Sequence, residues 1–279
     1  MEISTLAAYH CLVLAWYFFV LYSLTHLRTE ERPSEVFLYG GQWKYLTVLN
    51  LFLQAVFYGV SFLADVLRLI KELRCAKCVI SSRDLLFSVL AFPVSTFVSI
   101  SFWILYTYNR ELVYPKSLDG VIPTWLNHTM HTAVLPLALL EILATPHRYP
   151  AKKKGLFLLG CASFLYVSWV LWIYFVTGEW VYPLFASFSP AGLGAFFISS
   201  LAIVVCFYNF GEFLNQAEAG GEQGLPDPRL RGATAPPGGR PRSSASPGEA
   251  ALGFLTRSQR YPPRSHPPRM HSFEWITAF

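Results

Sequence analysis

Six long runs of hydrophobic residues divide the first 216 positions of the chain. Each is close to the roughly 20 residues that a helix needs to cross a bilayer. Backbone N–H and C=O groups find no water inside the hydrocarbon core, so runs of this kind are expected to be helical. The sequence therefore predicts an all-α polytopic membrane protein with six transmembrane helices, at residues 6–26, 45–67, 85–108, 125–143, 156–176 and 190–214.

Prolines lie inside two of these runs, at Pro93 in the third and Pro136 in the fourth. A proline within a helix removes one backbone donor and crowds the preceding turn. We therefore expect a kink in each of these two helices, supported by the neighbouring helices.

The second run carries a stripe of polar residues. At about 100° per residue they fall within one arc about 80° wide, so this helix presents a polar face to something other than lipid. The commonest use of such a face is a contact between helices that is joined by side-chain hydrogen bonds. The stripe consists of Thr47, Asn50, Gln54, Tyr58, Ser61 and Asp65, and the third run offers a face of small residues as its partner, at Asp84, Ser88, Ala91, Ser95 and Ser99.

Composition separates the hydrophobic body from the last part of the chain. Charged residues make up only 14% of the sequence, against about 25% in an average soluble domain. Residues 217–279 hold 10 of the 19 prolines and 8 of the 18 glycines. Such a segment buries too little apolar surface to offset its backbone entropy, so we expect residues 1–216 to form the membrane domain and 217–279 a disordered tail. The five cysteines are too scattered for a disulfide framework and are expected to be free thiols.

Lysine and arginine are distributed unequally between the two sides that six spans define. The N-terminus, residues 68–84, residues 144–154 and the tail carry 17 of them, and the opposite side carries 5. Because cytoplasmic segments are enriched in Lys and Arg, both termini are expected in the cytoplasm. The membrane itself is expected to be the plasma membrane or the endoplasmic reticulum.

The fourth run opens with two histidines, His128 and His131. Ionisable residues inside a membrane tend to face protein or a wet cavity. Three interpretations are open: a metal site, a general base for a hydroxyl nucleophile, or a polar helix start without chemistry. A metal site needs at least a third protein ligand, for which the candidates are His10, His26, Asp65 and Glu141.

Thr47 and His131 are expected at similar depth. The second and fourth runs both begin on the non-cytoplasmic side, with Thr47 about two residues into one and His131 about six into the other, a difference of about 6 Å at 1.5 Å per residue. A hydroxyl and an imidazole would then meet just below the interface, where an ester lying among lipid chains is accessible.

Several strings, in order along the body, resemble one family. They are Trp43-Lys44-Tyr45-Leu46-Thr47, Leu90-Ala91-Phe92-Pro93-Val94, Tyr114-Pro115-Lys116, Trp125-Leu126-Asn127-His128 with Met130-His131-Thr132, and Trp180-Val181-Tyr182-Pro183. Together they are similar to the androgen-induced protein and androgen-dependent TFPI-regulating protein family over about residues 9–215. Gln42 before Trp43 is a small departure from its pattern.

The resemblance implies a multi-span threonine hydrolase that cleaves fatty acid esters of hydroxy fatty acids. The catalytic threonine and histidine of the family match Thr47 and His131. Asn50, Asn127 and His128 are candidates for oxyanion donation or for orienting the base. Lys44 and Lys116 are candidates for holding the free carboxylate of the substrate.

Two other functions stay open. The first is a non-catalytic membrane regulator of the expression of the coagulation inhibitor TFPI, and the second is a metal-dependent intramembrane lipid hydrolase. The hydrolase interpretation requires no metal and no cofactor. Its expected partners are a lipid ester substrate within the bilayer and the membrane lipids, and the sequence holds no nucleotide-binding or nucleic-acid-binding motif.

Overall fold

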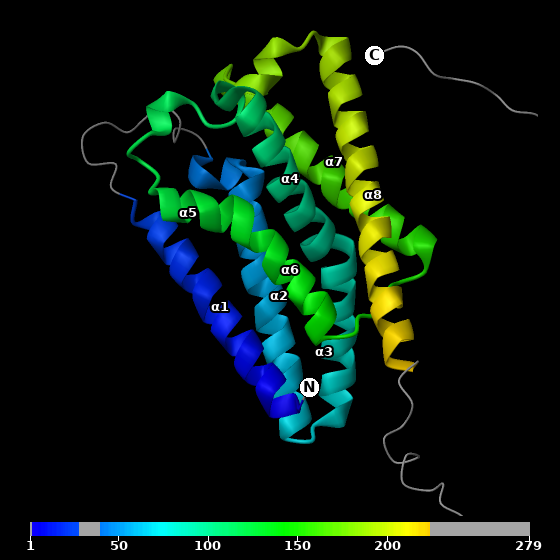
Figure 1. The fold of residues 1–279 in the computed structure, drawn as a ribbon. Coiled ribbons are helices and arrows are strands. Elements are labelled where there is room, and N and C mark those ends of the chain that lie inside the picture. The colour runs from blue at the N-terminus through cyan, green and yellow to red at the C-terminus, as the bar shows by residue number, and fades with distance from the viewer. Residues whose placement is uncertain (1, 28–39, 224–279) are drawn as a thin grey trace, which may run out of the picture. The chain divides into compact units, whose positions relative to one another are not determined.

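The computed structural model describes residues 2–27 and 40–223, which belong to one unit of the chain, residues 1–227. These residues are helical and contain no strand, as the hydrophobic pattern predicts. The part of the chain that the structure describes forms eight α-helices: α1 (Ile3–Thr25), α2 (Leu46–Leu69), α3 (Leu73–Leu86), α4 (Phe92–Asn109), α5 (Thr124–His128), α6 (Val134–Ala144), α7 (Lys152–Thr177) and α8 (Pro190–Gln223) (Figure 1).

Among the described residues, five helical stretches are long and apolar enough to cross a membrane. They are Ile3–Thr25, Leu46–Leu69, Leu73–Leu112, Lys152–Thr177 and Pro190–Glu218. The predicted span at 125–143 is helical from Thr124 to Ala144 but is not one of the five. Its polar residues, among them His131 and Glu141, make it less apolar than the others.

Two predicted boundaries differ from the structure. The basic segment 68–84, expected as a loop, is a loop only at residues 70–72, because α3 begins at Leu73 and continues into the third span. No glycine or proline interrupts this segment, and Lys71 makes the turn with a left-handed φ of 62°. At the other boundary, α8 passes residue 216 and ends at Gln223, while the rest of the predicted tail, 224–279, lies outside the described residues.

A π-helical segment precedes each of the two prolines. Phe87–Ala91 (η3) comes before Pro93, and Thr129–Ala133 (η6) comes before Pro136. In an α-helix, the carbonyl four residues before a proline receives no hydrogen bond, because proline has no backbone N–H to donate. These two carbonyls belong to Val89 and Thr132, and both lie within the π segments. The expected disturbance therefore takes the form of a π turn, a feature frequent at functional sites.

The polar stripe of α2 faces protein. Asn50, Gln54, Tyr58, Ser61 and Asp65 are all buried. The predicted contact with the third run is confirmed at one point, where Gln54 Nε2 donates to the carbonyl of Ala91 at 2.9 Å. Hydrophobic side chains of α1, α2, α5 and α6 complete the main core around this stripe.

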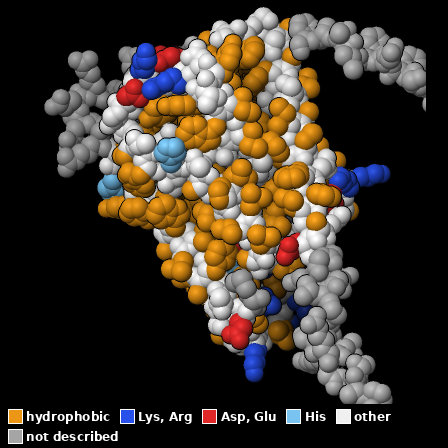
Figure 2. Space-filling model, viewed as in Figure 1, with side chains coloured by type: hydrophobic (Ala, Val, Ile, Leu, Met, Phe, Trp, Pro, Cys, Tyr) orange, Lys and Arg blue, Asp and Glu red, His pale blue; other side chains and the backbone are white. Residues whose placement is uncertain are grey.

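The outer surface is largely apolar. Hydrophobic side chains cover most of the face in Figure 2, and charged side chains lie mainly at its edges. The buried share of the span falls from 61% in residues 73–112 to 17% in α7 and 11% in α8. A helix that is hydrophobic all round yet exposed in this way fits a lipid-facing position. All five cysteines are free, as expected.

A chain of buried acidic and basic side chains joins α1, α2, α3 and α6 at the end of the bundle that holds the C-terminus of α2. His10 Nδ1 lies 2.6 Å from Asp65 Oδ2, and His10 Nε2 lies 3.2 Å from Glu141 Oε2. His147 continues the chain, 3.3 Å from Glu141 and 3.2 Å from Asp84. We call this set the buried ionic chain; its members are His10, Asp65, Glu141, His147, Asp84 and Arg83.

Candidate active site

Thr47 lies in the first turn of α2, at the opposite end of this helix from Asp65. Gly40 and Gly41 take left-handed φ values of 75° and 54° and turn the chain into the short 3-10 helix η2, Gly41–Lys44, from which α2 follows directly. The N–H of Leu46 donates to Tyr182 Oη at 3.1 Å. This bond fixes the first turn of α2 against the segment that follows α7.

His131 meets Thr47 from the helical run 124–144. Thr47 Oγ1 lies 3.2 Å from His131 Nε2, within hydrogen-bonding distance. The other ring nitrogen, Nδ1, lies 2.9 Å from Asn127 Oδ1 and 3.0 Å from the carbonyl oxygen of Asn127. Both contacts at Nδ1 are with oxygens, which can only accept, so Nδ1 carries a proton. In the neutral imidazole, Nε2 is then the acceptor for the threonine hydroxyl.

The imidazole of His131 is enclosed by apolar surroundings. Its ring stacks on Phe102 of α4, with centroids 3.5 Å apart and planes 8° from parallel, and the residue is only 5% exposed. Thr47 itself is partly buried. A hydroxyl, a neutral imidazole and a carbonyl that orients the imidazole are the parts of a nucleophile–base–orienter triad.

The other polar candidates divide into two groups. Asn127 contacts the base directly, as described above, and Asn50 is buried one turn after Thr47 on α2. His128 is exposed, stacks on Trp103 and lies 3.3 Å from Thr132 Oγ1. The structure therefore brings Asn127 to the Thr47–His131 pair and turns His128 away from it.

The two lysines also differ. Lys44 is buried at the end of η2, and its carbonyl accepts from Tyr166 Oη at 3.5 Å. Burial lowers the pKa of Lys44. Lys116 is exposed in the connection between α4 and α5, where its backbone N–H donates to Glu111.

The residues weighed as metal ligands do not gather around His131. His10, Asp65 and Glu141 belong to the buried ionic chain, and His26 pairs with the backbone of Tyr22. Within residues 2–27 and 40–223, no group of three or more His, Cys, Asp or Glu side chains is arranged to hold a metal ion. Both nitrogens of His131 are already engaged by protein oxygens.

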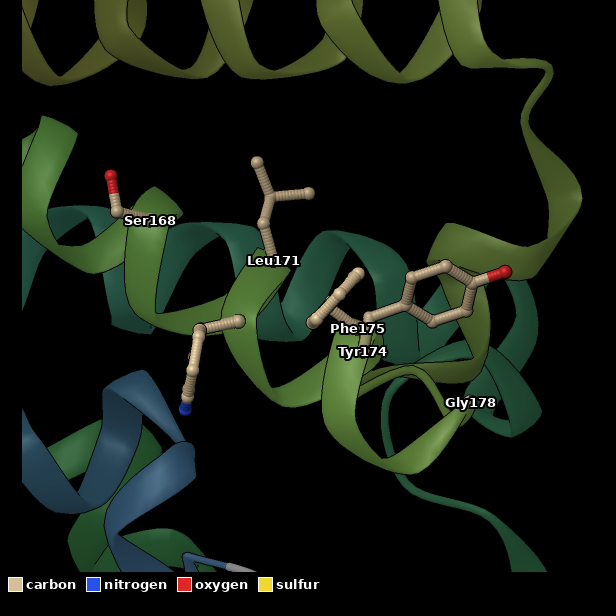
Figure 3. A pocket seen from close by; sticks show the side chains of 6 residues that line it. Ser168, Leu171, Tyr174, Phe175 and Gly178 are labelled. Carbon is tan, nitrogen blue, oxygen red and sulfur yellow. The ribbon is translucent and has the colours of Figure 1, made fainter.

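Two apolar hollows lie on the surface of the helices. One, of about 740 Å³, lies between α1 and the start of α2, and Phe18, Leu21, Trp43, Val48 and Phe52 line part of it. It borders the first turn of α2 through Val48, and its lining includes neither Thr47 nor His131. The other, about 660 Å³, is an open depression along α7, lined in part by Leu171 and Phe175 (Figure 3), and it shares no residue with the Thr47–His131 pair.

Comparison with known proteins identifies the family of this chain. The family described as FAR-17a/AIG1-like protein matches residues 5–216, a stretch that contains Thr47, Asn127 and His131. The chain belongs to the FAR-17a/AIG1-like family. The family segment ends before the last residues of α8.

The chain is similar to several named proteins over most of their length. The human androgen-dependent TFPI-regulating protein is 52% identical over 207 residues, which are 74% of this chain and 90% of that protein. The human androgen-induced gene 1 protein is 43% identical over 69% of this chain and 83% of its own length. A UPF0641 membrane protein of Schizosaccharomyces pombe is 26% identical over 61% of this chain and 73% of its own length. No solved structure matches the chain.

The sequence analysis named Asn127 as a candidate for orienting the base, and it did not predict two other features of the candidate site. The role of Asn127 as the partner of His131 had a signal, because residues four apart lie on one helix face. The stacking of Phe102 on His131 and the bond from Leu46 to Tyr182 had none, since each joins distant parts of the chain.

Proposed function

We propose that this chain is an intramembrane threonine hydrolase that cleaves fatty acid esters of hydroxy fatty acids. The observation that carries the proposal is the 3.2 Å contact between Thr47 Oγ1 and His131 Nε2, with Nδ1 held by Asn127. An ester hydrolase needs a nucleophile within reach of a base that a third group orients. The membrane-spanning helices and the apolar hollow beside α2 support a lipid substrate.

The reaction proceeds as two acyl transfers. In the first, His131 Nε2 takes the proton of Thr47 Oγ1 while that oxygen attacks the ester carbonyl. The tetrahedral intermediate then expels the alcohol oxygen, which receives the proton from His131, and the hydroxy fatty acid leaves. The products of this half-reaction are an acyl-threonine ester at Thr47 and a neutral His131.

Water completes the second transfer. His131 Nε2 accepts a proton from water as the water oxygen attacks the acyl-threonine carbonyl, and it returns this proton to Thr47 Oγ1 when the C–O bond breaks. The fatty acid leaves and the enzyme is restored. Every proton passes through Nε2, so the mechanism requires Nδ1 to stay protonated against Asn127.

Further features support a proposal for the side of the membrane on which the reaction takes place and for the residue that binds the substrate carboxylate. Thr47 lies in the first turn of α2, and the charge distribution favours a cytoplasmic N-terminus, so we propose that the pair lies beneath the non-cytoplasmic headgroups. We propose that Lys44, three residues before Thr47, binds the free carboxylate that such substrates carry.

The test compares the purified protein with Thr47→Ala and His131→Ala on a panel of branched lipid esters. Both variants should lose ester cleavage while their expression and folding stay normal. A fluorophosphonate probe, which reacts with activated hydroxyl groups, should label the unaltered protein at Thr47 and neither variant. Full turnover by Thr47→Ala would instead indicate a hydrolase with another nucleophile. Absence of ester cleavage by the unaltered protein would favour a protein that regulates without this chemistry.

A further inference from the structure

The side chain of Asn50 is held in one orientation. Its Oδ1 accepts from Gln54 Nε2 at 3.1 Å, and Gln54 Nε2 uses its other hydrogen on the carbonyl of Ala91 at 2.9 Å. Because the Gln54 amide offers only donors here, the oxygen of Asn50 must face Gln54. The Asn50 amide nitrogen therefore points away from Gln54.

This nitrogen is buried and unused. Asn50 is 0% exposed, and its Nδ2 has no hydrogen-bond partner among the residues that the structure describes. Leaving a buried donor without an acceptor destabilises the folded state, because the donor loses its hydrogen bonds to water. Such a group in a native structure calls for an explanation, and a donor waiting for an acceptor at a reaction site is one.

Asn50 lies close to Thr47 along α2, so the oxygen of an ester carbonyl that Thr47 attacks would be an acceptor within its reach. Residues three apart on a helix are neighbours, with Cβ atoms about 5–6 Å apart. Helical side chains lean toward the N-terminus, so Asn50 covers the turn that contains Thr47. Gln54 occupies the turn on the C-terminal side, which leaves the Thr47 side to the Asn50 nitrogen.

The electrostatics at this place suit a negative oxygen. Thr47 lies at the N-terminus of α2, a helix of 24 residues. The dipole of a helix favours negative charge at its first turn. Of the other two polar candidates, Asn127 contacts His131 through its Oδ1, and His128 lies near Thr132.

We propose that Asn50 is the oxyanion donor of the reaction, an inference that rests on the proposed function. As Thr47 Oγ1 attacks the ester carbonyl, the π electrons of the carbonyl move onto its oxygen. Asn50 Nδ2–H donates a hydrogen bond to this oxygen and transfers no proton. When the intermediate collapses, the carbonyl re-forms, the leaving alkoxide takes its proton from His131, and Asn50 is unchanged.

Two substitutions at Asn50 test the role, with a matched control on the same stripe. Asn50→Ala removes the donor, and Asn50→Asp removes the donor but keeps an acceptor for Gln54, so it decides the question if the alanine variant does not fold. Ser61→Ala is the control, because Ser61 is also buried with an unpartnered oxygen but lies farther along α2. Each folded variant is assayed on a branched lipid ester and on a fatty acyl trifluoromethyl ketone, which forms a tetrahedral adduct with the nucleophile.

Loss of an oxyanion donor costs about 10²–10³ in kcat. Both Asn50 variants should show this loss with KM nearly unchanged, and their inhibition by the ketone should weaken by a similar factor. Ser61→Ala should match the unaltered protein. The inference is overturned if either folded Asn50 variant stays within threefold of the unaltered protein in kcat, or loses kcat without weaker ketone inhibition. An active Thr47→Ala would instead overturn the proposed function itself.

Discussion

Asn127 decides which nitrogen His131 presents to Thr47. The sequence placed Thr47 and His131 at similar depth, and the structure places Thr47 Oγ1 3.2 Å from His131 Nε2. The family resemblance pointed to His131, but the residue pattern by itself did not separate His131 from His128, because two histidines three residues apart both lie near the same helix face. The π turn at 129–133 and the bond to Asn127 separate them in the structure.

Removing the Asn127 side chain should weaken the base without removing it. Asn127→Ala loses the bond from His131 Nδ1 to Oδ1, while the backbone carbonyl still accepts. A net hydrogen bond is worth about 1 kcal/mol, so kcat should fall by about fivefold with KM unchanged. Steady-state kinetics of ester cleavage check this, with His128→Ala as the control that keeps full activity. An Asn127→Ala enzyme as fast as the unaltered one would contradict the role.

If Lys44 binds the free carboxylate of the substrate, KM should depend on the charge of the substrate and on pH. Lys44→Met should raise KM for an ester with a free carboxylate and leave KM for its methyl ester unchanged, and Lys116→Met should alter neither. Burial lowers the pKa of Lys44, so the ammonium group is lost at lower pH than in an exposed lysine. KM for the free acid should therefore rise as pH increases through this lowered pKa. An equal response of the acid and the methyl ester would exclude a carboxylate site at Lys44.

At the scale of elements, hydrophobic periodicity located the helices but not their interruptions. The six runs all became helical because an apolar run in a membrane has one satisfactory backbone structure. Pro93 and Pro136 predicted an irregularity in the third and fourth helices. Whether it becomes a kink or a π turn depends on the neighbouring helices. The buried ionic chain was equally hidden, since His10 and Glu141 lie 131 residues apart.

The buried ionic chain should matter for stability. Removing one partner of a buried ion pair costs about 3–5 kcal/mol, so Glu141→Ala, which takes the carboxylate from between His10 and His147, should lower the unfolding midpoint clearly. Glu212→Ala breaks an exposed pair with Lys152 and should cost less than about 1 kcal/mol. Thermal unfolding in detergent, followed by tryptophan fluorescence, measures both. Equal midpoints for the two variants would contradict a stabilising role for the chain.

At the scale of the whole molecule, the Thr47–His131 pair and the basic segments lie at opposite ends of the bundle. Tyr182 contacts the first turn of α2, whereas Arg83 and His147 contact one another through Asp84 at the far end. The sequence predicted this polarity by counting Lys and Arg, a rule about insertion rather than packing. The packing of the helices shows which residues lie at each end of the bundle. Which end faces the cytoplasm is a question for experiment.

Thiol accessibility measures that direction. In a chain that keeps only Cys75 and Cys78, an impermeant maleimide should label intact cells poorly and permeabilised cells well, because both thiols are exposed in α3 beside basic residues. A cysteine-free chain carrying Glu179→Cys, at an exposed position near Tyr182, should show the opposite pattern if the protein is at the cell surface. In an internal membrane, selective permeabilisation of the plasma membrane gives the same comparison. Labelling of Cys75 and Cys78 from the non-cytoplasmic side would reverse the proposed orientation.

The acyl-threonine intermediate is the species that separates this mechanism from every alternative. Purified protein is mixed with a fatty acid ester of a hydroxy fatty acid, quenched with acid within the first turnover and digested for mass spectrometry. The mechanism predicts a fatty acyl group on the peptide that contains Thr47, with its mass set by the acyl chain of the substrate, and no such adduct in His131→Ala. Ester cleavage at the normal rate with an acyl group on another residue, or with Thr47 replaced by alanine, would contradict it.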